Sequence, residues 1–260
     1  MKNTTIRISR RRGLTLVELV MVIMVTLILG TFVWKAAAKT IGWANNSRMS
    51  IEISQMSKAL DAFCMRFGDY PPDLHDQLAV WKFLKARFPR CPRQKYPDLA
   101  KHSPASALYF WLAGPNGKGY SVNATDPFGD GGKRIAPFYK FDKERVKLVD
   151  GVMEFFPPRS KEGSAPYLYF RGSGAKGYDG HPGWSPAKPY RDSVAGKWIN
   201  PDTYQILCAG NDGKFGGGNH YPGGPDYDEA NLDDITSFSQ GDTLERAIPK
   251  LGTDKAKKVQ

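Results

Sequence analysis

Cysteine is scarce in this sequence, which excludes a protein held together by a disulfide framework. Three cysteines occur among 260 residues, and an odd number leaves at least one of them unpaired. Either Cys64 and Cys91 form one disulfide outside the cytoplasm, or all three cysteines, Cys208 included, are small buried side chains. No C-x-x-C pair is present, so the cysteines do not indicate a zinc site.

Motifs for the common catalytic sites are also missing. The sequence has no G-x-S-x-G, no H-E-x-x-H and no G-K-[ST]. One G-x-G-x-x-G occurs at residues 172–177, but the residues after it cannot begin a helix, so a dinucleotide site is rejected. The histidines are scattered, and we place each on the surface of a loop or helix: His75, His102, His181 and His220. We therefore expect neither catalysis nor a zinc site.

The distribution of charge argues against a nucleic-acid partner. Lys and Arg number 37 against 26 Asp and Glu, a net charge of +11. Five of the positive charges lie within the first 12 residues, and removal of that leader leaves +6. No basic cluster is interleaved with aromatic residues, as nucleic-acid binding would require. The basic residues of 249–260 form a terminal tail that we expect to be disordered.

One long apolar run lies near the N-terminus. From Leu14 to Trp34 the only charged residue is Glu18. Because about 20 apolar residues in a helix span a bilayer core of roughly 30 Å, the run predicts a membrane span at 14–34. The basic residues before it place the N-terminus in the cytoplasm and the remainder of the chain outside. A carboxylate inside such a span costs about 2.5 to 3.5 kcal/mol, so Glu18 needs a partner.

The start of this run resembles the type IV prepilin motif. Residues 13–18 read G-L-T-L-V-E and follow three arginines. The resemblance implies that prepilin peptidase cleaves between Gly13 and Leu14 and methylates the new amine of Leu14, a position where the family usually has Phe. It also implies that Glu18 pairs with the amine of the next subunit in a filament, so that two buried charges neutralise each other.

Three other kinds of export signal could be assigned to this N-terminal segment, but each explains fewer of its residues. A cleavable signal peptide has an apolar core of about 7 to 15 residues, and this run is longer and contains Glu18. A twin-arginine signal over residues 9–14 would lack its Phe and Lys. An ordinary signal anchor leaves Glu18 without a role. The prepilin interpretation is therefore preferred.

The helix is expected to continue past the apolar run as an amphipathic part at 35–68. Apolar residues recur there at spacings of three and four: Ile53, Met56, Leu60, Phe63 and Phe67. Gly68 supplies a C-cap, and the prolines that follow Tyr70 end the helix. Residues 67–72 resemble the turn that ends the long helix of the major pseudopilin of type II secretion.

The rest of the chain is expected to form a helical elaboration at 69–125 and a β region at 126–248. Helices are predicted at 74–88 and from the N-cap Ser103 to Gly114. Runs at 152–156, 167–170 and 204–209, separated by glycine and proline, predict an antiparallel sheet. Either residues 138–141 or residues 167–169 correspond to the core strand of the pseudopilin family.

A pair of loops near the C-terminus resembles the calcium loop of the major pseudopilin. The sequence A-G-N-D-G-K-F-G-G begins at Ala209, and L-D-D-I-T-S-F begins at Leu232. Calcium binds six to eight oxygen ligands. The resemblance implies as ligands Asp212, Asp234, either Asp233 or Asp228, and the carbonyl of Ala209. The competing interpretation is a glycine-rich surface loop with solvated aspartates; the spacing does not fit an EF-hand.

These features together predict an α+β fold of the type IV pilin or pseudopilin kind. In it, a long N-terminal helix, spanning a membrane in its first half and amphipathic in its second, packs on a small antiparallel sheet with a loop-rich C-terminal region. Residues 1–13 would be the leader, and the remaining domain would lie in the periplasm, anchored by a single pass in the bacterial inner membrane.

The expected function is that of a structural subunit. It would be processed by prepilin peptidase and assemble through its N-terminal helix into a periplasmic pseudopilus or other filament for protein secretion. Its partners would be other pseudopilin subunits, an inner-membrane secretion platform and membrane lipid, and its cofactor structural calcium. The alternative is a membrane-anchored or exported binding protein, stabilised by calcium, that forms no filament. The sequence does not choose between type II secretion and a type IV pilus, or between a major and a minor subunit.

Overall fold

The computed structural model describes residues 15–223 and 227–247, apart from the side chains of residues 32, 33 and 35–39. The chain divides into two compact units, Met1–Ala44 and Asn45–Gln260, which are described separately. The proposed processing residues Gly13 and Leu14, and the predicted tail at 249–260, lie outside the described residues.

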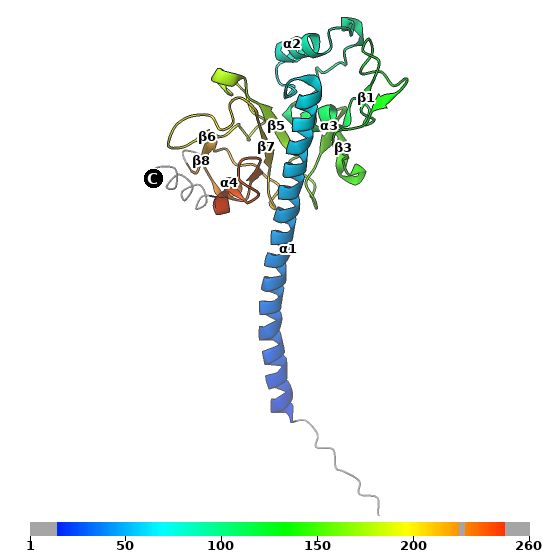
Figure 1. The fold of residues 1–260 in the computed structure, drawn as a ribbon. Helices are drawn as coiled ribbons and strands as arrows, with labels where there is room; N and C mark the ends of the chain where they lie inside the picture. The colour runs from blue at the N-terminus through cyan, green and yellow to red at the C-terminus, as the bar shows by residue number, and fades with distance from the viewer. Residues whose placement is uncertain (1–14, 224–226, 248–260) are drawn as a thin grey trace, which may run out of the picture. The chain divides into compact units, whose positions relative to one another are not determined.

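The longest element is the helix α1, which runs from Leu16 to Phe67 (Figure 1). No helix in the described part of the chain combines the length and the apolar character that a membrane span needs. The predicted fold class, with a membrane-spanning first half of the long helix at 14–34, is therefore wrong on this point. Polar side chains interrupt the apolar run in this part of α1 at Glu18, Thr26 and Thr31.

In the second unit, α1 contributes one stripe of side chains to the hydrophobic core. The stripe has the spacing of three and four residues that the sequence predicts, and its members are at most 3% exposed: Met49, Ile53, Met56, Leu60 and Phe63. Phe63 contacts the rings of Trp111, Tyr120 and Phe138 at centroid distances of 5.9, 6.2 and 5.3 Å. This stripe therefore anchors the helix to the aromatic centre of the unit.

The end of α1 follows the predicted glycine cap. Gly68 has a φ of +85°, and its N–H donates to the carbonyl of Cys64 at 2.7 Å. The chain then turns through Pro71 and Pro72, whose carbonyls accept hydrogen bonds from the buried side chains of Tyr169 and Trp111. These two bonds fix the turn against the core.

Two shorter helices follow in the elaborated region. The helix α2, Gln77–Arg87, begins three residues later than predicted, because Leu74 has a φ of +68° and Asp76 is the N-cap. The helix α3, Pro104–Ala113, confirms the predicted start and end: Ser103 caps it, Pro104 is its first residue and Gly114 follows it. Nine of its residues are buried, and it packs against the strands β4 (Val152–Phe155) and β5 (Leu168–Arg171).

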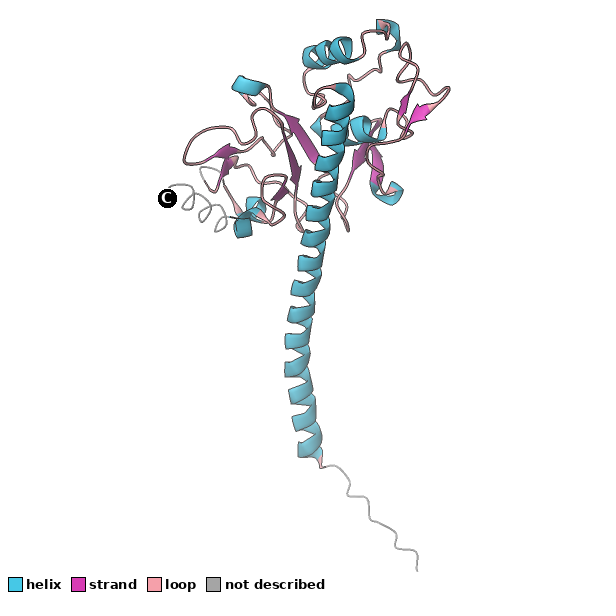
Figure 2. Ribbon diagram, in the orientation of Figure 1, coloured by secondary structure: helices cyan, strands magenta, loops and turns pink. Residues whose placement is uncertain are grey.

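The strands are short (Figure 2), and within the described residues they form four separate small sheets; the prediction of a single antiparallel sheet is wrong. Three antiparallel strands make the largest: β5 (Leu168–Arg171), β7 (Tyr204–Cys208) and β9 (Ile235–Thr236). Two-stranded antiparallel sheets are β1 (Tyr120–Ser121) with β2 (Arg134–Ile135), and β3 (Val146–Val149) with β4 (Val152–Phe155). The pair β6 (Arg191–Asp192) and β8 (His220–Tyr221) is parallel. Frequent glycine and proline keep these strands too short to join one sheet.

The remaining elements are single turns. They are the 3-10 helices η1 (Arg93–Lys95), η2 (Lys143–Arg145) and η3 (Gly174–Lys176), and the helix α4 (Glu229–Leu232). Residues 138–141, one of the two candidates for the family's core strand, lie in a loop, whereas residues 168–171 form β5.

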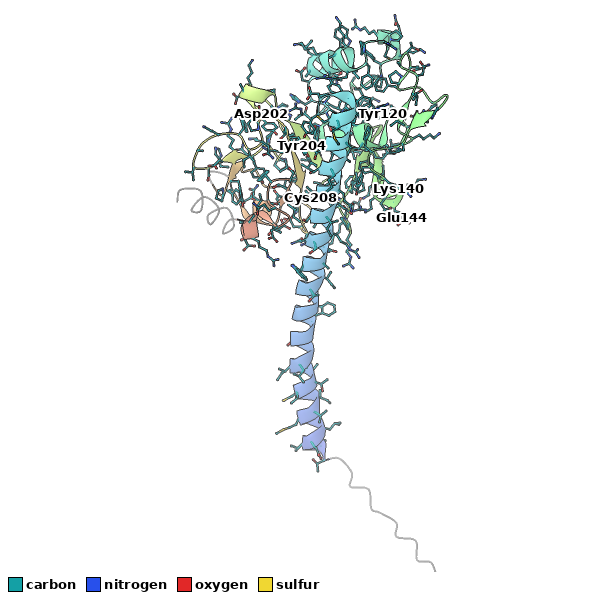
Figure 3. The ribbon with its side chains drawn as sticks, viewed as in Figure 1. Tyr120, Lys140, Glu144, Asp202, Tyr204 and Cys208 are labelled. Carbon is teal, nitrogen blue, oxygen red and sulfur yellow. The ribbon has the colours of Figure 1, made fainter. Side chains whose placement is uncertain are left out.

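The strand β7 lies beside α1 in the second unit (Figures 1 and 3). At one end of the strand the Tyr204 hydroxyl donates to the carbonyl of Ser57 at 3.3 Å. At the other end Cys208 Sγ lies 3.3 Å from Met49 Sδ. Both contacts join the strand to the buried face of the helix, and they hold the loop that follows Cys208 in a defined position.

Candidate metal centres

Glu18, the predicted assembly residue, lies in the first turn of α1. Its backbone N–H donates to Thr15 Oγ1 at 3.2 Å, and its side chain is exposed. The neighbouring apolar side chains are exposed as well, by between 42% and 78% from Leu16 to Leu29. The first unit therefore presents an apolar helix surface that carries one carboxylate.

The two loops with the predicted calcium ligands meet in the second unit. Asp233 Oδ2 accepts hydrogen bonds from the N–H groups of Asn211 at 2.8 Å and Asp212 at 3.1 Å. This approach needs glycine at position 210, where φ is +55° and an added Cβ would lie 2.3 Å from the carbonyl oxygen of Asp233. The sequence correctly predicted that these loops are neighbours.

We call the two loops together, residues 209–217 and 228–234, the acidic loop. Asp234 is its buried carboxyl group. It is fully buried, and the hydroxyl of Tyr190 donates to its Oδ2 at 3.0 Å. The other oxygen, Oδ1, is buried without a hydrogen-bond partner among the described residues. Burial raises the pKa of Asp234 well above its usual range, and the charges of Asp233, Asp212 and Asp228 raise it further against the opposing Tyr190 bond.

Asp233 also has one carboxylate oxygen that accepts no hydrogen bond from the described residues. Its Oδ1 is buried without a hydrogen-bond partner among the described residues. Burial and the charge of Asp212 raise the pKa of Asp233 to about 6, although backbone N–H groups on its other oxygen act in the opposite direction. Carboxylate oxygens without a hydrogen-bond partner are the kind of donor that a hard cation such as calcium uses.

The other predicted ligands lie at the edge of the acidic loop. Asp212 and Asp228 are exposed; Asp212 Oδ1 accepts from the N–H of Lys214 at 2.7 Å, and Asp228 caps α4. The carbonyl of Ala209 accepts from the N–H of Gly213 at 3.0 Å and keeps a second lone pair. The oxygens are of the chemical type that calcium binds, but in the described chain no three of these four carboxyl groups have ligand atoms within 4.8 Å of one another.

A different group of side chains converges more tightly. Among the described residues, one group of three or more potential ligands has all its ligand atoms within 4.8 Å of one another: Asp73, His75 and His181. The side chains of Asp73 and His181 are 4% and 3% exposed. The placement of His181 on a surface is therefore wrong, because the loop after β5 folds it onto the turn after α1.

The histidines of this group are held by one carboxylate. Asp73 Oδ1 lies 2.5 Å from His75 Nδ1, and Asp73 Oδ2 lies 2.8 Å from His181 Nε2. Burial alone would raise the pKa of Asp73, but the hydrogen bonds from the two histidines outweigh it and hold that pKa well below its usual range. The D-x-H spacing of residues 73–75 is the only local signal of this group, and nothing local points to His181.

The cysteines take no part in either group. None of them, all within the described chain, forms a disulfide, and Cys91 and Cys208 are buried. Of the two possibilities left open by the sequence, the structure thus supports small buried side chains for these two. Burial raises the pKa of the Cys208 thiol, so it stays protonated at neutral pH.

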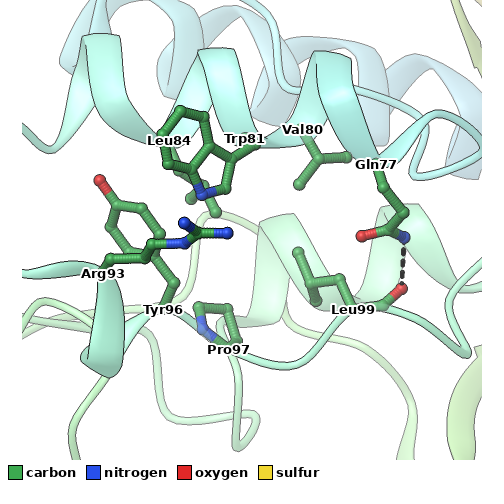
Figure 4. Close-up of a pocket in the computed structure, with 8 residues that line it drawn as sticks. All are labelled: Gln77, Val80, Trp81, Leu84, Arg93, Tyr96, Pro97 and Leu99. Carbon is green, nitrogen blue, oxygen red and sulfur yellow. Dashed lines mark hydrogen bonds between the residues drawn. The ribbon is translucent and has the colours of Figure 1, made fainter.

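A small cavity of about 180 Å³ lies between α2 and the segment 93–99 (Figure 4). The guanidinium of Arg93 lies 4.9 Å from the ring centre of Trp81, and the amide of Gln77 donates to the carbonyl of Leu99 at 2.9 Å. These contacts join α2 to the segment 93–99 and stabilise the packing of residues 69–125.

Comparison with protein-family models, with curated proteins and with solved structures finds no match for this chain.

Proposed function

We propose that this chain is a structural subunit of a pilin-like filament and that it assembles through the N-terminal part of α1. The observation that carries the proposal is the exposed apolar surface from Leu16 to Leu29. A helix that is apolar around its whole circumference is stable only when another apolar surface packs against it. Burial of apolar surface contributes about 25 cal/mol of favourable free energy for each Å² removed from water. The same segment of other copies offers a cover of matching chemistry and length.

Glu18 gives the assembly its register. Cleavage between Gly13 and Leu14 would create a positive amine next to the apolar surface, and a carboxylate on a neighbouring copy would neutralise it. An unpaired carboxylate among packed apolar side chains is costly, so copies shifted along one another are disfavoured. The motif G-L-T-L-V-E supports this pairing, because it contains both the cleavage position and the acid.

The proposal includes the partners that the prepilin motif implies. These are prepilin peptidase, other pilin-like subunits and a secretion platform, and type II secretion is the machine whose major pseudopilin the two later motifs resemble. A single-pass location in the inner membrane is not part of the proposal, because it depended on a membrane span.

We propose further that the acidic loop binds calcium. The two buried oxygens without partners, Asp233 Oδ1 and Asp234 Oδ1, support this assignment. Calcium would balance the charges that now raise the pKa of both carboxyl groups, and it would hold the loop after β7 against the segment before β9. The ion would then have a structural role.

Two measurements test the filament proposal. Intact-mass analysis of the protein from its native host should show a chain that begins at Leu14 and carries one methyl group. Cysteine crosslinking between copies along α1 should give a ladder of multimers that Glu18→Ala abolishes. The matched control is Glu144→Ala, which removes an exposed acid from the second unit and should leave the ladder unchanged. A mature chain that still begins at Met1, or a ladder unaffected by Glu18→Ala, contradicts the proposal.

A further inference from the structure

We propose that Asp73, His75 and His181 form a binding site for a divalent transition-metal ion of the zinc type. Two imidazole nitrogens and one carboxylate oxygen within 4.8 Å of one another are a ligand set that zinc accepts, with a fourth position left for water. This site is separate from the acidic loop and does not depend on the proposed function.

The charge around Asp73 favours a cation. The carboxylate is buried, and Arg171 donates its backbone N–H to it at 2.9 Å. The guanidinium of Arg171 is directed to Asp69 at 3.1 Å and to backbone carbonyls. When both imidazoles are neutral, the group carries a net negative charge in a buried place, which a positive ion would balance. Burial alone would lower the pKa of His75, but the hydrogen bond and charge of Asp73 outweigh it and raise that pKa, so a proton on this ring is the charge with which the metal ion competes.

The geometry brings the ligands together from two distant segments. The ring centres of His75 and His181 are 3.8 Å apart, and both rings face the same carboxylate. Leu74, between the first two ligands, has a φ of +68°, a strained conformation for a leucine that persists only when the surroundings hold it in place. It places Asp73 and His75 close enough to contact each other through their side chains.

An open path leads to the group. The side chain of His75 is 27% exposed, and the three residues line a pocket of about 510 Å³. A metal ion could enter from this pocket, and water there could complete its coordination. Asp76, Asp179 and Arg171 also line the pocket; Asp179 pairs with Arg191 at 3.5 Å, so the excess of negative charge in the lining comes from Asp73 and Asp76 against one guanidinium.

Metal binding requires both ring protons to change position. The N–H of Gly183 donates to His181 Nδ1 at 2.9 Å, so in the metal-free protein the proton of this ring is on Nε2 and points at Asp73. When Nε2 binds the metal, that proton moves to Nδ1, and the partly exposed amide of Gly183 turns to water. The proton of His75 moves from Nδ1 to Nε2. The number of protons on two neutral rings is unchanged, whereas any protonated ring must release one.

The test is a titration of the metal-free full-length chain with zinc at neutral pH, in excess calcium so that the acidic loop is occupied. We expect one equivalent of zinc to bind, and cobalt to give the visible absorption of a site with nitrogen ligands and low coordination number. His75→Ala should weaken zinc binding by roughly 100-fold, the upper end of the effect of losing even an outer-shell partner. His220→Ala is the matched control, because its Nδ1 has no hydrogen-bond partner among the described residues, and it should bind zinc as the wild type does.

Folding of each variant is checked by circular dichroism, and Asp234→Asn should retain zinc binding. His75 is the residue to substitute first, since it is the most exposed of the three ligands. Absence of zinc binding by the folded wild type, or equal affinity of the wild type and a folded His75→Ala variant, overturns the proposal and leaves Asp73 with two histidines as a hydrogen-bonded group only.

Discussion

The Tyr190 hydroxyl donates a 3.0 Å hydrogen bond to Asp234, 44 residues away in the sequence, and leaves the second oxygen of that carboxyl group without a partner. The same hydroxyl accepts a hydrogen bond from the side-chain amide of Asn231 at 2.8 Å. One oxygen of this buried carboxyl group is therefore fixed, and the other has no hydrogen-bond partner among the described residues. The first two predictions follow from this arrangement.

Calcium should raise the melting temperature of the protein. An ion that binds only the folded form contributes about 2.7 kcal/mol when its concentration is 100 times the dissociation constant. Asp234→Asn should remove this response, because the amide that replaces the inner carboxylate carries no charge. Thermal unfolding with calcium and with a chelator measures the difference. Asp202→Asn, at an exposed site in another loop, should respond as the wild type does, and an equal response of all three proteins would contradict a calcium site at Asp234.

Without calcium, stability should fall as the pH rises from about 4 to 6. The pKa of Asp233 is about 6 in the folded protein against an ordinary value of 3.8, so between these values the folded form keeps a proton that the unfolded form has lost. Each step to higher pH in this window therefore favours the unfolded form. Urea unfolding at several pH values in a chelator should show a shallower fall for Asp233→Asn. Parallel curves for the two proteins would show that Asp233 is not responsible.

Glu52→Ala should destabilise the second unit by about 2 kcal/mol. Glu52 on α1 accepts hydrogen bonds from Arg145 at 2.6 and 3.1 Å and from the hydroxyl of Tyr167 at 2.6 Å. A hydrogen bond to a charged group contributes about 1.5 to 3 kcal/mol, and the truncation leaves a largely buried guanidinium without its carboxylate. Urea unfolding measures the change. Glu144→Ala, in the neighbouring exposed turn, is the control and should shift the midpoint little.

Phe63→Ala should cost about 3 to 5 kcal/mol. Phe63 is fully buried and contacts Phe67, Phe83 and Trp111 as well as two further rings, so its removal leaves a cavity at the centre of the core. Met65→Ala on the opposite side of α1, where the side chain is 82% exposed, should change stability by less than about 0.5 kcal/mol. Similar losses for the two variants in urea unfolding would show that this face of α1 is not the anchored one.

Local features of the fold could be predicted where neighbouring residues decide them. Ser103, Pro104 and Gly114 supply the start, first residue and end of α3, and all three act within a turn of the helix. The buried stripe of α1 follows from the helical period. By contrast, α2 begins later than its apolar pattern suggests, because the conformation of Leu74 depends on contacts of Asp73 and His75 that the pattern does not contain.

The two candidate metal centres also differ in whether residues close together in the sequence reveal them. The acidic loop could be found because its aspartates lie in two short segments with a familiar spacing. The group around Asp73 could not be found, since His181 is 108 residues from its partner and the sequence near it has no metal-binding spacing.

The sequence by itself determined the apolar N-terminal run, the caps of α3, the glycine that ends α1, the approximate positions of β4, β5 and β7, and the acidic pairs, because each depends on residues close together in the chain. Tertiary structure decided which of these segments meet. In the part of the chain that the structure describes, it divided the strands among four small sheets, buried the His181 side chain against Asp73 and left one oxygen of Asp234 without a hydrogen-bond partner. The reason is physical: local preferences act over a few residues, whereas the contacts between distant segments of the second unit follow from how those segments pack into its two hydrophobic clusters.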